Sequence, residues 1–295
     1  MLLKTAHKIA LARVASSVIL KTRSWLGLGE RLIVTRQGIR WNVDPREGFD
    51  LSIYLLGSVE PPVIRAYPRL IRKGDVILDV GANIGGHTLH FARLCGPEGL
   101  VIAVEPSDWA MAKLQANLDL NPELRGIVRA RQFFLGAPGG ENSPESKQEV
   151  YASWPLDHSD GLHEKHLGKK TPVTQATVGT IDSLVQAEKL SRVDAIKIDV
   201  DGDEWKILKG SAQTLEKHRP VVIMELAPYL FSPEEFNQMI SFLEKSRYAF
   251  FDATNGRPYP TDPDLIRKLI PEGATGNVIL RPSEKVAESA LRSPR

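Results

Sequence analysis

The sequence predicts an α/β domain built on a mostly parallel sheet. Continuous apolar runs recur through the middle of the chain, which is typical of strands buried on both faces of a parallel sheet. Segments with helical periodicity separate these runs, and such alternation of strand and helix is the pattern of an α/β sheet. The predicted parallel strands lie at 76–80, 101–104, 127–134, 195–198 and 221–224.

Helices are expected between these strands, and two further strands close the domain. Ser232-Pro233-Glu234-Glu235 begins one helix, with serine as the N-cap, proline in the first turn and acids that favour the helix dipole. The other predicted helices lie at 63–71, 87–95, 109–120 and 204–217. The late strands are predicted at 248–251 and 277–280, and a small hairpin is predicted from 32–34 and 39–43.

Composition places the chain among ordinary globular proteins. It has 295 residues, of which 42% are hydrophobic and 25% charged, and this excludes global disorder, collagen and a disulfide scaffold. Cys95 is the single cysteine, so neither an intrachain disulfide nor a cysteine-based zinc cluster can form. We predict a basic arm and hairpin at 1–47, a main domain at 48–283 and a flexible tail at 284–295. Within the main domain, the Gly-, Pro- and Ser-rich stretch 136–170 is a candidate substrate lid.

Charge is concentrated at the start of the chain. Residues 1–40 carry a balance of +7, whereas the remainder carries −5. The arm has two interpretations: contact with anionic lipid or nucleic acid, or a solvated helix beside the domain. Its apolar run is too short to span a membrane. Arg13 interrupts this run, which disfavours a signal peptide, whereas an organellar transit peptide is not excluded. We expect a cytoplasmic protein, with weak peripheral membrane contact through residues 1–25 as one option.

The first motif that carries chemistry runs from Asp79 to Gly86, where a strand passes through glycines into a helix. Ligands of such sheets bind beyond the carboxyl ends of the strands, and the following helix N-terminus favours an anionic group. The spacing lacks the G-x-G-x-x-G of dinucleotide sites. Asp79 suits a ligand with an ammonium group and would repel a pyrophosphate. The pattern therefore favours S-adenosylmethionine, which carries both an amine and a carboxylate.

The second motif is Glu105-Pro106 at the end of the next strand. An acid about this far beyond the first motif can bind both ribose hydroxyls of an adenosine ligand. It would repel a 2′-phosphate, which disfavours NADP. The plain alternative is an acid that caps the next helix.

The third motif runs from Lys197 to Glu204 and contains alternating aspartates. It fails as a calcium loop, because Glu204 stands where that loop needs glycine. Asp199 instead ends a buried strand beside the expected cofactor cleft and is the candidate catalytic acid. Asp201 and Glu204 are candidate substrate contacts, and the alternative is that Asp203 and Glu204 are first-turn acids favoured by the helix dipole.

These motifs together resemble the FkbM family of S-adenosylmethionine-dependent methyltransferases. The resemblance covers roughly residues 48–282. It rests on D-V-G-A-N-I-G at 79–85, E-P at 105–106, T-I-D-S-L at 180–184, K-I-D-V-D-G-D-E at 197–204, L-K-G at 208–210 and M-E at 224–225, in this order. It implies the class I methyltransferase fold, with a seven-stranded, mostly parallel sheet and a reversed final strand. It also implies O-methylation of a sugar or a polyketide-like metabolite.

Carried over residue by residue, the resemblance implies a cofactor site. Asp79, Gly81, Asn83 and Gly85 would contact the methionine part, Glu105 with Pro106 would hold the ribose, and Glu60 matches an upstream glutamate near the cofactor. Two positions depart from the family pattern. Asp201 replaces a glutamate, which puts a water or substrate contact in doubt, and His87 stands where an aromatic residue is common.

A methyl transfer to a hydroxyl needs alignment and a base. The sulfonium makes the methyl group electrophilic, so alignment dominates, and a base adds about 10²–10⁴-fold. Asp199 is the first candidate base and Glu225 the second. His158, His163 and His166 of the long stretch are alternative bases or metal ligands, although a solvated loop is the favoured explanation because they show no regular ligand geometry. Trp154 can stack on a sugar or simply anchor that loop, and no metal site is predicted.

Two other functions were weighed. A class I methyltransferase acting on RNA or protein is the main alternative, but the −5 charge of the body disfavours RNA. A binding module or a nicotinamide enzyme is disfavoured by Asp79 and by the missing G-x-G. The expected partner is therefore a small hydroxylated molecule, with no nucleic acid, and the oligomeric state stays open.

Overall fold

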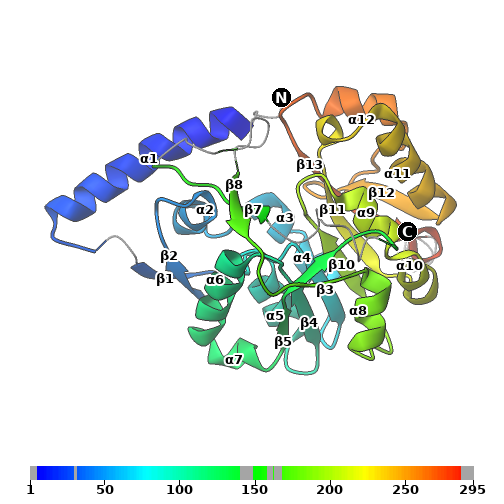
Figure 1. The fold of residues 1–295 in the computed structure, drawn as a ribbon, viewed down its shortest axis with the longest axis horizontal. Coiled ribbons are helices and arrows are strands. Elements are labelled where there is room, and N and C mark those ends of the chain that lie inside the picture. The colour runs from blue at the N-terminus through cyan, green and yellow to red at the C-terminus, as the bar shows by residue number, and fades with distance from the viewer. Residues whose placement is uncertain (1–4, 30–31, 140–148, 158–161, 163–167, 287–295) are drawn as a thin grey trace, which may run out of the picture.

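The computed structural model describes residues 5–29, 32–139, 149–157, 162 and 168–286. A central sheet carries helices on both faces, and a long N-terminal helix extends from one side of this body (Figure 1). The N-terminal helix and Thr275, which directly precedes the last strand, both line the cavity described below.

The central sheet has seven strands in the order β12-β13-β11-β10-β3-β4-β5. Six of them run in the same direction, and β13 is antiparallel to both of its neighbours. This is the predicted α/β architecture, a seven-stranded and mostly parallel sheet with a reversed final strand. The strands are β3 (Val76–Val80), β4 (Leu100–Val104), β5 (Val128–Arg131), β10 (Ala195–Ile198), β11 (Val221–Leu226), β12 (Tyr248–Asp252) and β13 (Gly276–Pro282).

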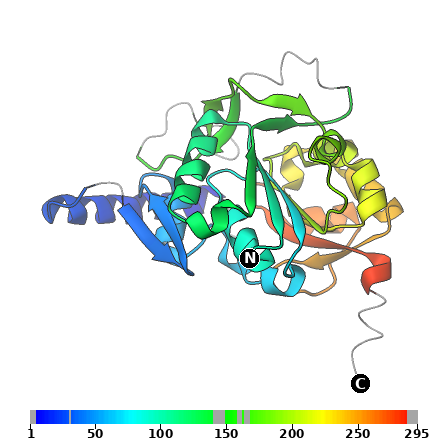
Figure 2. The same cartoon turned by 90° about the horizontal axis from the view of Figure 1, so that it is seen from below.

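The apolar strands face two separate cores because successive side chains point to opposite faces of a sheet. Leu78 packs in one core with helices α8 to α11, whereas its neighbour Ile77 packs in the other with α4, α5 and α6. Figure 2 shows the sheet between these two layers. The helices are α3 (Pro61–Ile64), α4 (Tyr67–Leu70), α5 (Thr88–Cys95), α6 (Asp108–Asp119), α7 (Pro122–Arg125), α8 (Ile181–Ala187), α9 (Glu204–Lys209), α10 (Ala212–His218), α11 (Pro233–Lys245) and α12 (Pro263–Leu269), with a 3-10 turn at Pro228–Leu230.

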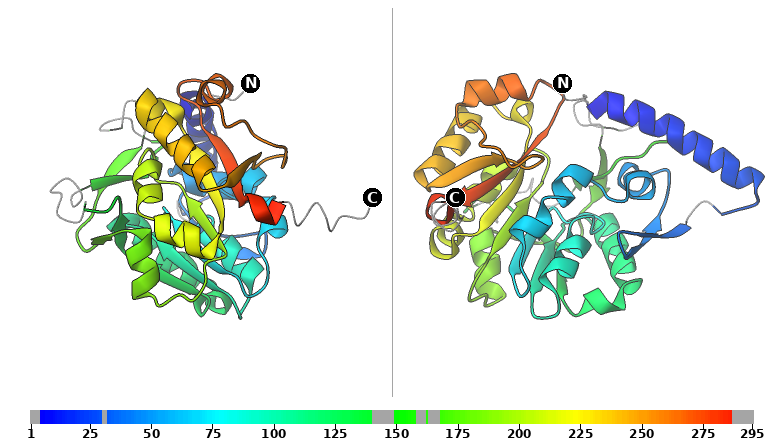
Figure 3. Two further views of the ribbon diagram at one scale, coloured as in Figure 1. Left: turned by 90° about the vertical axis from the view of Figure 1, so that its right-hand side faces the viewer. Right: turned by 180° about the vertical axis from the view of Figure 1, so that it is seen from behind.

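The N-terminal part consists of α1 (Thr5–Trp25), the hairpin β1 (Leu32–Arg36) and β2 (Ile39–Val43), and α2 (Gly48–Leu56). β1 and β2 pair antiparallel, as predicted. Figure 3 shows α1 extending away from the sheet and its helices. Within the part of the chain that the structure describes, no helix is long and apolar enough to cross a membrane.

The long stretch after β5 contains ordered pieces that the sequence pattern did not predict. β6 (Phe133–Leu135) pairs with β9 (Thr177–Gly179), and β7 (Glu149–Ser153) pairs with β8 (Lys169–Pro172). We call β7 and β8 the cover hairpin, because they lie over the start of α6, as described below. The intervening residues 140–148, 158–161 and 163–167, with His158, His163 and His166, lie outside the described residues, as do 287–295 of the predicted tail.

Several predicted elements are divided in the structure. The helix expected at 63–71 is two short helices, since Pro68 lacks the N–H that would continue the first. The helix expected at 204–217 breaks at Gly210-Ser211 between α9 and α10. The strand expected at 127–134 leaves the sheet after Arg131 and pairs elsewhere. The helices α2, α7, α8 and α12 were not predicted from the sequence.

Candidate active site

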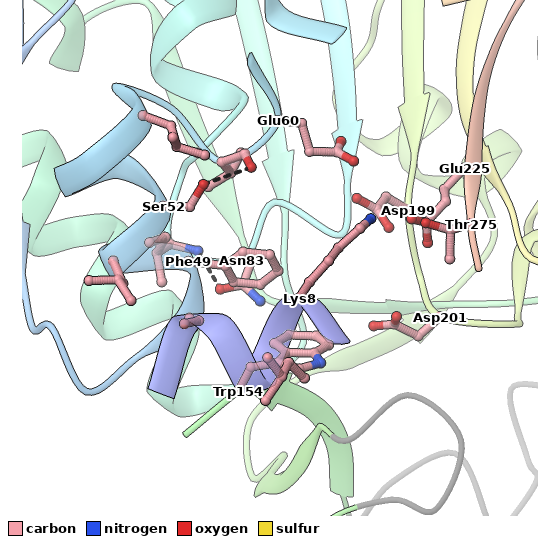
Figure 4. A pocket seen from close by; sticks show the side chains of 18 of the residues that line it. Lys8, Phe49, Ser52, Glu60, Asn83, Trp154, Asp199, Asp201, Glu225 and Thr275 are labelled. Carbon is pink, nitrogen blue, oxygen red and sulfur yellow. Dashed lines mark hydrogen bonds between the residues drawn. The ribbon is translucent and has the colours of Figure 1, made fainter. Parts of the chain in front are cut away.

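A cavity of about 680 Å³ lies at the carboxyl ends of β3, β10 and β11, a volume typical of small-molecule sites. Figure 4 shows acidic side chains on one side of it, with Phe49 and Trp154 on others. We call Glu60, Asp199, Asp201 and Glu225, together with Lys197, the acidic floor. We call the facing aliphatic residues of α1 and α2 the apolar wall: Ile9, Leu11, Ala12, Ala15, Leu51, Leu55 and Leu56.

Parallel pairing brings the floor together from distant parts of the sequence. β10 lies between β3 and β11, with Ile198 opposite Val80 on one side and Met224 on the other. The next residues along each strand are Asp199, Gly81 and Glu225, so three segments of the predicted motifs meet at one edge. Sequence order alone could not show this, because the strands are adjacent only in the folded sheet.

Gly81 lets two of these strand ends approach closely. Its φ is +80°, and a Cβ there would lie 1.8 Å from the backbone oxygen of Asp199. Any side chain would therefore push the β10 end away from the β3 end. The glycine of the first motif fixes the position of Asp199 as well as opening backbone to a ligand.

Lys197 and Asp199 form an ion pair with a distance of 2.8 Å between Nζ and Oδ2. Lys197 is buried, whereas Asp199 faces the cavity. Burial disfavours the ammonium, but the carboxylates of Asp199, Asp79 and Glu60 raise the pKa of Lys197 above its ordinary value. The lysine is thus a fixed cation behind the floor. The feature of the sequence that marks Lys197 is its position inside an otherwise apolar strand, and the sequence motifs predict no role for this residue.

Glu60 enters the floor from the loop between α2 and α3. Ser52 Oγ donates to the carbonyl oxygens of Ser58 and Val59, which holds this loop against α2. Asn277 Nδ2 donates to Glu60 Oε1 over 3.0 Å. His87 Nε2 lies 3.5 Å from Glu60 Oε2.

These neighbours keep Glu60 charged. Burial opposes ionisation, but His87 and Lys197 lower the pKa of Glu60 below its ordinary value. Tyr67 Oη lies 2.6 Å from His87 Nδ1, which orients the imidazole. Glu60, His87 and Asp199 each place a possible ligand atom within 4.8 Å of the others, so this corner can hold a cation.

Glu225 and Asp201 differ from Asp199 in their surroundings. Burial and the charge of Asp199 raise the pKa of both carboxyls well above the ordinary value. Their surroundings thus favour the protonated form of both carboxyls, which can donate a hydrogen bond, whereas the buried Lys197 balances the charge of Asp199.

Four candidate cofactor residues do not line the cavity. Asp79 is buried behind it and accepts a hydrogen bond from Thr88 Oγ1 at 2.5 Å. Gly85 packs against Leu89 and Leu114. The remaining two are Glu105 and Pro106, at the end of β4.

The Glu105 carboxylate is covered in this structure. Its oxygens accept hydrogen bonds from the backbone N–H groups of Asn83 and Ser107, each over 2.9 Å. Burial raises the pKa of Glu105 to about 7, against the lowering effect of these two hydrogen bonds. The cover hairpin lies over this region, since Asn83 Nδ2 donates to the Ala152 carbonyl and Thr171 Oγ1 to Ser107 Oγ.

The structure separates the candidate substrate residues. Asp201 and Trp154 line the cavity, and the Trp154 ring packs edge-on against Phe49 with centroids 4.7 Å apart. Glu204 is buried outside it, where its carboxylate accepts from the N–H groups of Val200 and Gly202. This contact holds the loop that carries Asp201. His158 lies outside the described residues.

The sequence analysis missed the contribution of α1 and α2 to the cavity. Lys8 lies on α1, and its side chain extends toward the acidic floor (Figure 4). Phe49 and Leu55 come from α2. No motif marks these positions, because ordinary aliphatic and aromatic residues on helices are far more often core residues.

Comparison with protein families matches residues 79–250, more than half of the chain, to the methyltransferase FkbM domain. Among curated proteins, the hexuronic acid methyltransferase AglP of Haloferax volcanii is 30% identical over 166 residues, which cover 56% of this chain and 61% of AglP. The methyltransferase sdnD of Sordaria araneosa is 28% identical over 180 residues, covering 54% of this chain and 69% of sdnD. The match to AglP thus leaves more than a third of that protein uncovered.

Among solved structures, the chain is similar to the methyltransferase FkbM of Methylobacillus flagellatus. The identity is 14% and the TM-score 0.41, and the alignment covers 79% of this chain and 54% of that one.

Proposed function

Since the chain belongs to the FkbM methyltransferase family, we propose that it transfers a methyl group to a hydroxyl oxygen of a sugar, a sugar acid or a polyketide-like metabolite. S-adenosylmethionine is its cofactor and supplies the methyl group from a sulfonium. The similarity to a protein named as a hexuronic acid methyltransferase supports the sugar acid among these acceptors.

The cavity fits this cofactor by its charge and its backbone. The acidic floor carries more carboxyl groups than cations, which favours a ligand with sulfonium and ammonium charges. Glu60 Oε2 is buried and makes no hydrogen bond, with His87 Nε2 3.5 Å away, so it has capacity for an ammonium. The loop from Gly81 to His87 also lines the cavity, and its N–H groups precede α5. We assign Glu60, Gly81 and Asn83 to the methionine part, with Asp79 and Gly85 shaping the loop from behind.

Glu105 is assigned to the ribose hydroxyls, with Pro106 beside it. In this structure the cover hairpin closes that part of the site, through the hydrogen bond from Asn83 Nδ2 to the Ala152 carbonyl. Cofactor entry then requires the cover hairpin to move away from Asn83.

Asp199 is proposed as the base. The observation that carries this role is its ion pair with the buried Lys197 at the cavity edge of β10. The pair fixes one carboxylate oxygen, and the other can accept the proton of an acceptor hydroxyl as the methyl group is transferred. Positioned bases contribute about 10²–10⁴-fold to such reactions.

Glu225, the second candidate base, has a different role in this proposal. Burial and the neighbouring charges of Asp199 and Glu60 raise its pKa well above the ordinary value, which favours the protonated form over a proton-accepting carboxylate. It can donate a hydrogen bond to an acceptor oxygen, as can Asp201. Trp154 offers its ring as a stacking surface for the acceptor.

The test combines calorimetric titration of S-adenosylhomocysteine with transfer of labelled methyl groups to a panel of hexuronides, neutral glycosides and polyketide alcohols. We expect Asp199→Asn to keep its affinity for S-adenosylhomocysteine within about threefold and to lose about 10²–10⁴-fold in turnover. Asp203→Asn is the matched control, because Asp203 pairs with Lys206 on the surface outside the cavity.

Two outcomes would contradict the proposal. Unchanged turnover in Asp199→Asn would make Asp199 a structural partner of Lys197 only. Failure of the wild type to bind S-adenosylhomocysteine would contradict the assigned cofactor site.

A further inference from the structure

The outer face of α1 carries an apolar stripe. Leu11, Val14, Val18 and Trp25 follow one another at intervals of three, four and seven residues, so they share one side of the helix. Their exposed fractions are 67%, 66%, 59% and 85%. The opposite side of α1 faces the body, where Ser16 is buried. The stripe is therefore a second apolar face, which the described structure leaves in solvent.

The charge around the stripe is entirely basic. α1 contains no acidic residue, and its Lys21 lies beside the stripe, whereas the Lys8 side chain extends into the cavity. Residues 1–40 as a whole carry +7. An apolar helix face bordered by lysines is typical of helices that lie in a membrane interface, and anionic headgroups attract such a segment. A second copy of the chain would instead bring like charges together.

The stripe is continuous with the cavity. Leu11 belongs both to the stripe and to the apolar wall. Leu55 and Leu56 of α2 also line the cavity and are 51% and 64% exposed. The apolar wall therefore reaches the outer surface between α1 and α2, on the side of the molecule where the stripe lies.

We propose that α1 docks through this stripe on an anionic lipid surface, and that the acceptor is an amphiphile whose apolar part lies along the apolar wall while its hydroxyl reaches Asp199. The inference rests on the proposed methyl transfer to a hydroxyl. It adds that the acceptor headgroup carries a lipid or a long alkyl chain. The apolar wall would have no partner on a small free sugar.

Docking is tested by sedimentation with vesicles of phosphatidylcholine, with and without about 40% phosphatidylglycerol, at about 0.1 M and about 0.5 M salt. We expect the wild type to bind the anionic vesicles and to lose most of that binding at the higher salt. Val14→Glu with Val18→Glu should weaken binding roughly tenfold or more, because it places charge in the stripe.

Ser17→Glu with Ser24→Glu is the matched control. It adds the same charge to exposed positions roughly a quarter turn away from the stripe, and we expect a clearly smaller loss. Equal losses in the two variants would mean that net charge alone acts, and absence of wild-type binding would overturn docking. Dimerisation that Val14→Glu with Val18→Glu abolishes would assign the stripe to a second copy instead.

The acceptor class is tested with n-dodecyl β-D-glucoside, below its micelle concentration, against methyl β-D-glucoside on protein saturated with S-adenosylhomocysteine. We expect binding of the dodecyl compound only, weakened at least fivefold or so by Leu55→Ser with Leu56→Ser, since each buried apolar side chain contributes to such contacts. Equal binding of both glucosides, or no effect of the variant, would overturn the amphiphile.

The outcome for the proposed function is separate, because it depends on S-adenosylhomocysteine binding and on methyl transfer alone. Wild-type protein that methylates a soluble acceptor but ignores vesicles would refute only the inference. Protein that binds vesicles but not S-adenosylhomocysteine would refute only the proposed function.

Discussion

The acidic floor and the apolar wall face the same cavity but are built in different ways. The floor consists mainly of residues at or just beyond strand ends, where backbone pairing and the close approach of Gly81 to Asp199 fix each position. The wall consists of side chains on α1 and α2, several of which are also exposed. The floor is therefore rigid and sensitive to small changes. The exposed side chains of the wall can be substituted with little effect on stability, and their contribution is to ligand binding.

The largest effect is expected for Gly81→Ala, which disrupts the close backbone contact between Gly81 and Asp199 beneath the floor. A Cβ at this position meets the Asp199 backbone oxygen at a positive φ, so we expect a loss of about 3 kcal/mol in the free energy of unfolding. Urea denaturation measures it. Gly126→Ala is the control, since φ is −72° there and nothing lies within 4 Å. Similar stability of the two variants would contradict a backbone-fixed floor.

Lys197→Met comes next, because it leaves the floor without its buried cation. The carboxylate of Asp199 would lose its partner beside Glu60, and removing one member of a buried pair is strongly destabilising. Asp199 is partly exposed, so we expect about 2 kcal/mol, measured by denaturation. Lys206→Met breaks the surface pair with Asp203 and should change stability by less than about 0.5 kcal/mol. A cost no greater than that of Lys206→Met would show that the floor needs no cation.

The pH dependence of cofactor binding tests the role of Glu105, which lies beside the floor and not in it. Its pKa of about 7 means that the ionised fraction rises from roughly one tenth at pH 6 to roughly nine tenths at pH 8. Ribose hydroxyls donate to the ionised form, so affinity for S-adenosylhomocysteine should rise up to about tenfold over this range. Calorimetric titration should show no such rise in affinity with pH for Glu105→Gln.

Glu204→Gln is the control for that experiment. Burial also raises the pKa of Glu204 to about 7, but its carboxylate holds a loop outside the cavity, so the rise should persist. Both acids bind protons more tightly in the folded chain than in the unfolded one. Their ionisation therefore lowers stability as pH increases from about 4.5 to about 7. If the affinity of Glu105→Gln still rises with pH, the titrating group lies elsewhere.

The smallest effect is expected at the apolar stripe of α1, which adjoins the wall at Leu11. Val14→Glu with Val18→Glu changes side chains that are mostly in solvent, so stability should shift by no more than about 0.5 kcal/mol. Thermal denaturation without lipid measures it. A loss above about 2 kcal/mol would mean that the stripe packs within the protein, which would remove the contrast between the floor and the exposed face of α1.

The predictions from sequence were most accurate for elements that a local pattern defines, such as an apolar run or a helix cap. The apolar runs at 76–80 and 195–198 are strands of the sheet, and the cap at Ser232 begins α11 with a capping box. Helix 204–217 failed at Gly210-Ser211 because periodicity continues across the break. α2 was missed because its apolar residues do not form a distinct helical pattern.

Local sequence determined the strands, the capped helices and the acids that follow the strands, because these depend on periodicity and on the chemistry of single residues. Tertiary structure alone decided that the ends of β3, β10 and β11 meet around Asp199 and that the cover hairpin closes over Glu105. It also decided that α1, a plain basic helix by sequence, forms one wall of the site. Such contacts join segments far apart in the chain, and their geometry is set only when the sheet and its helices pack together.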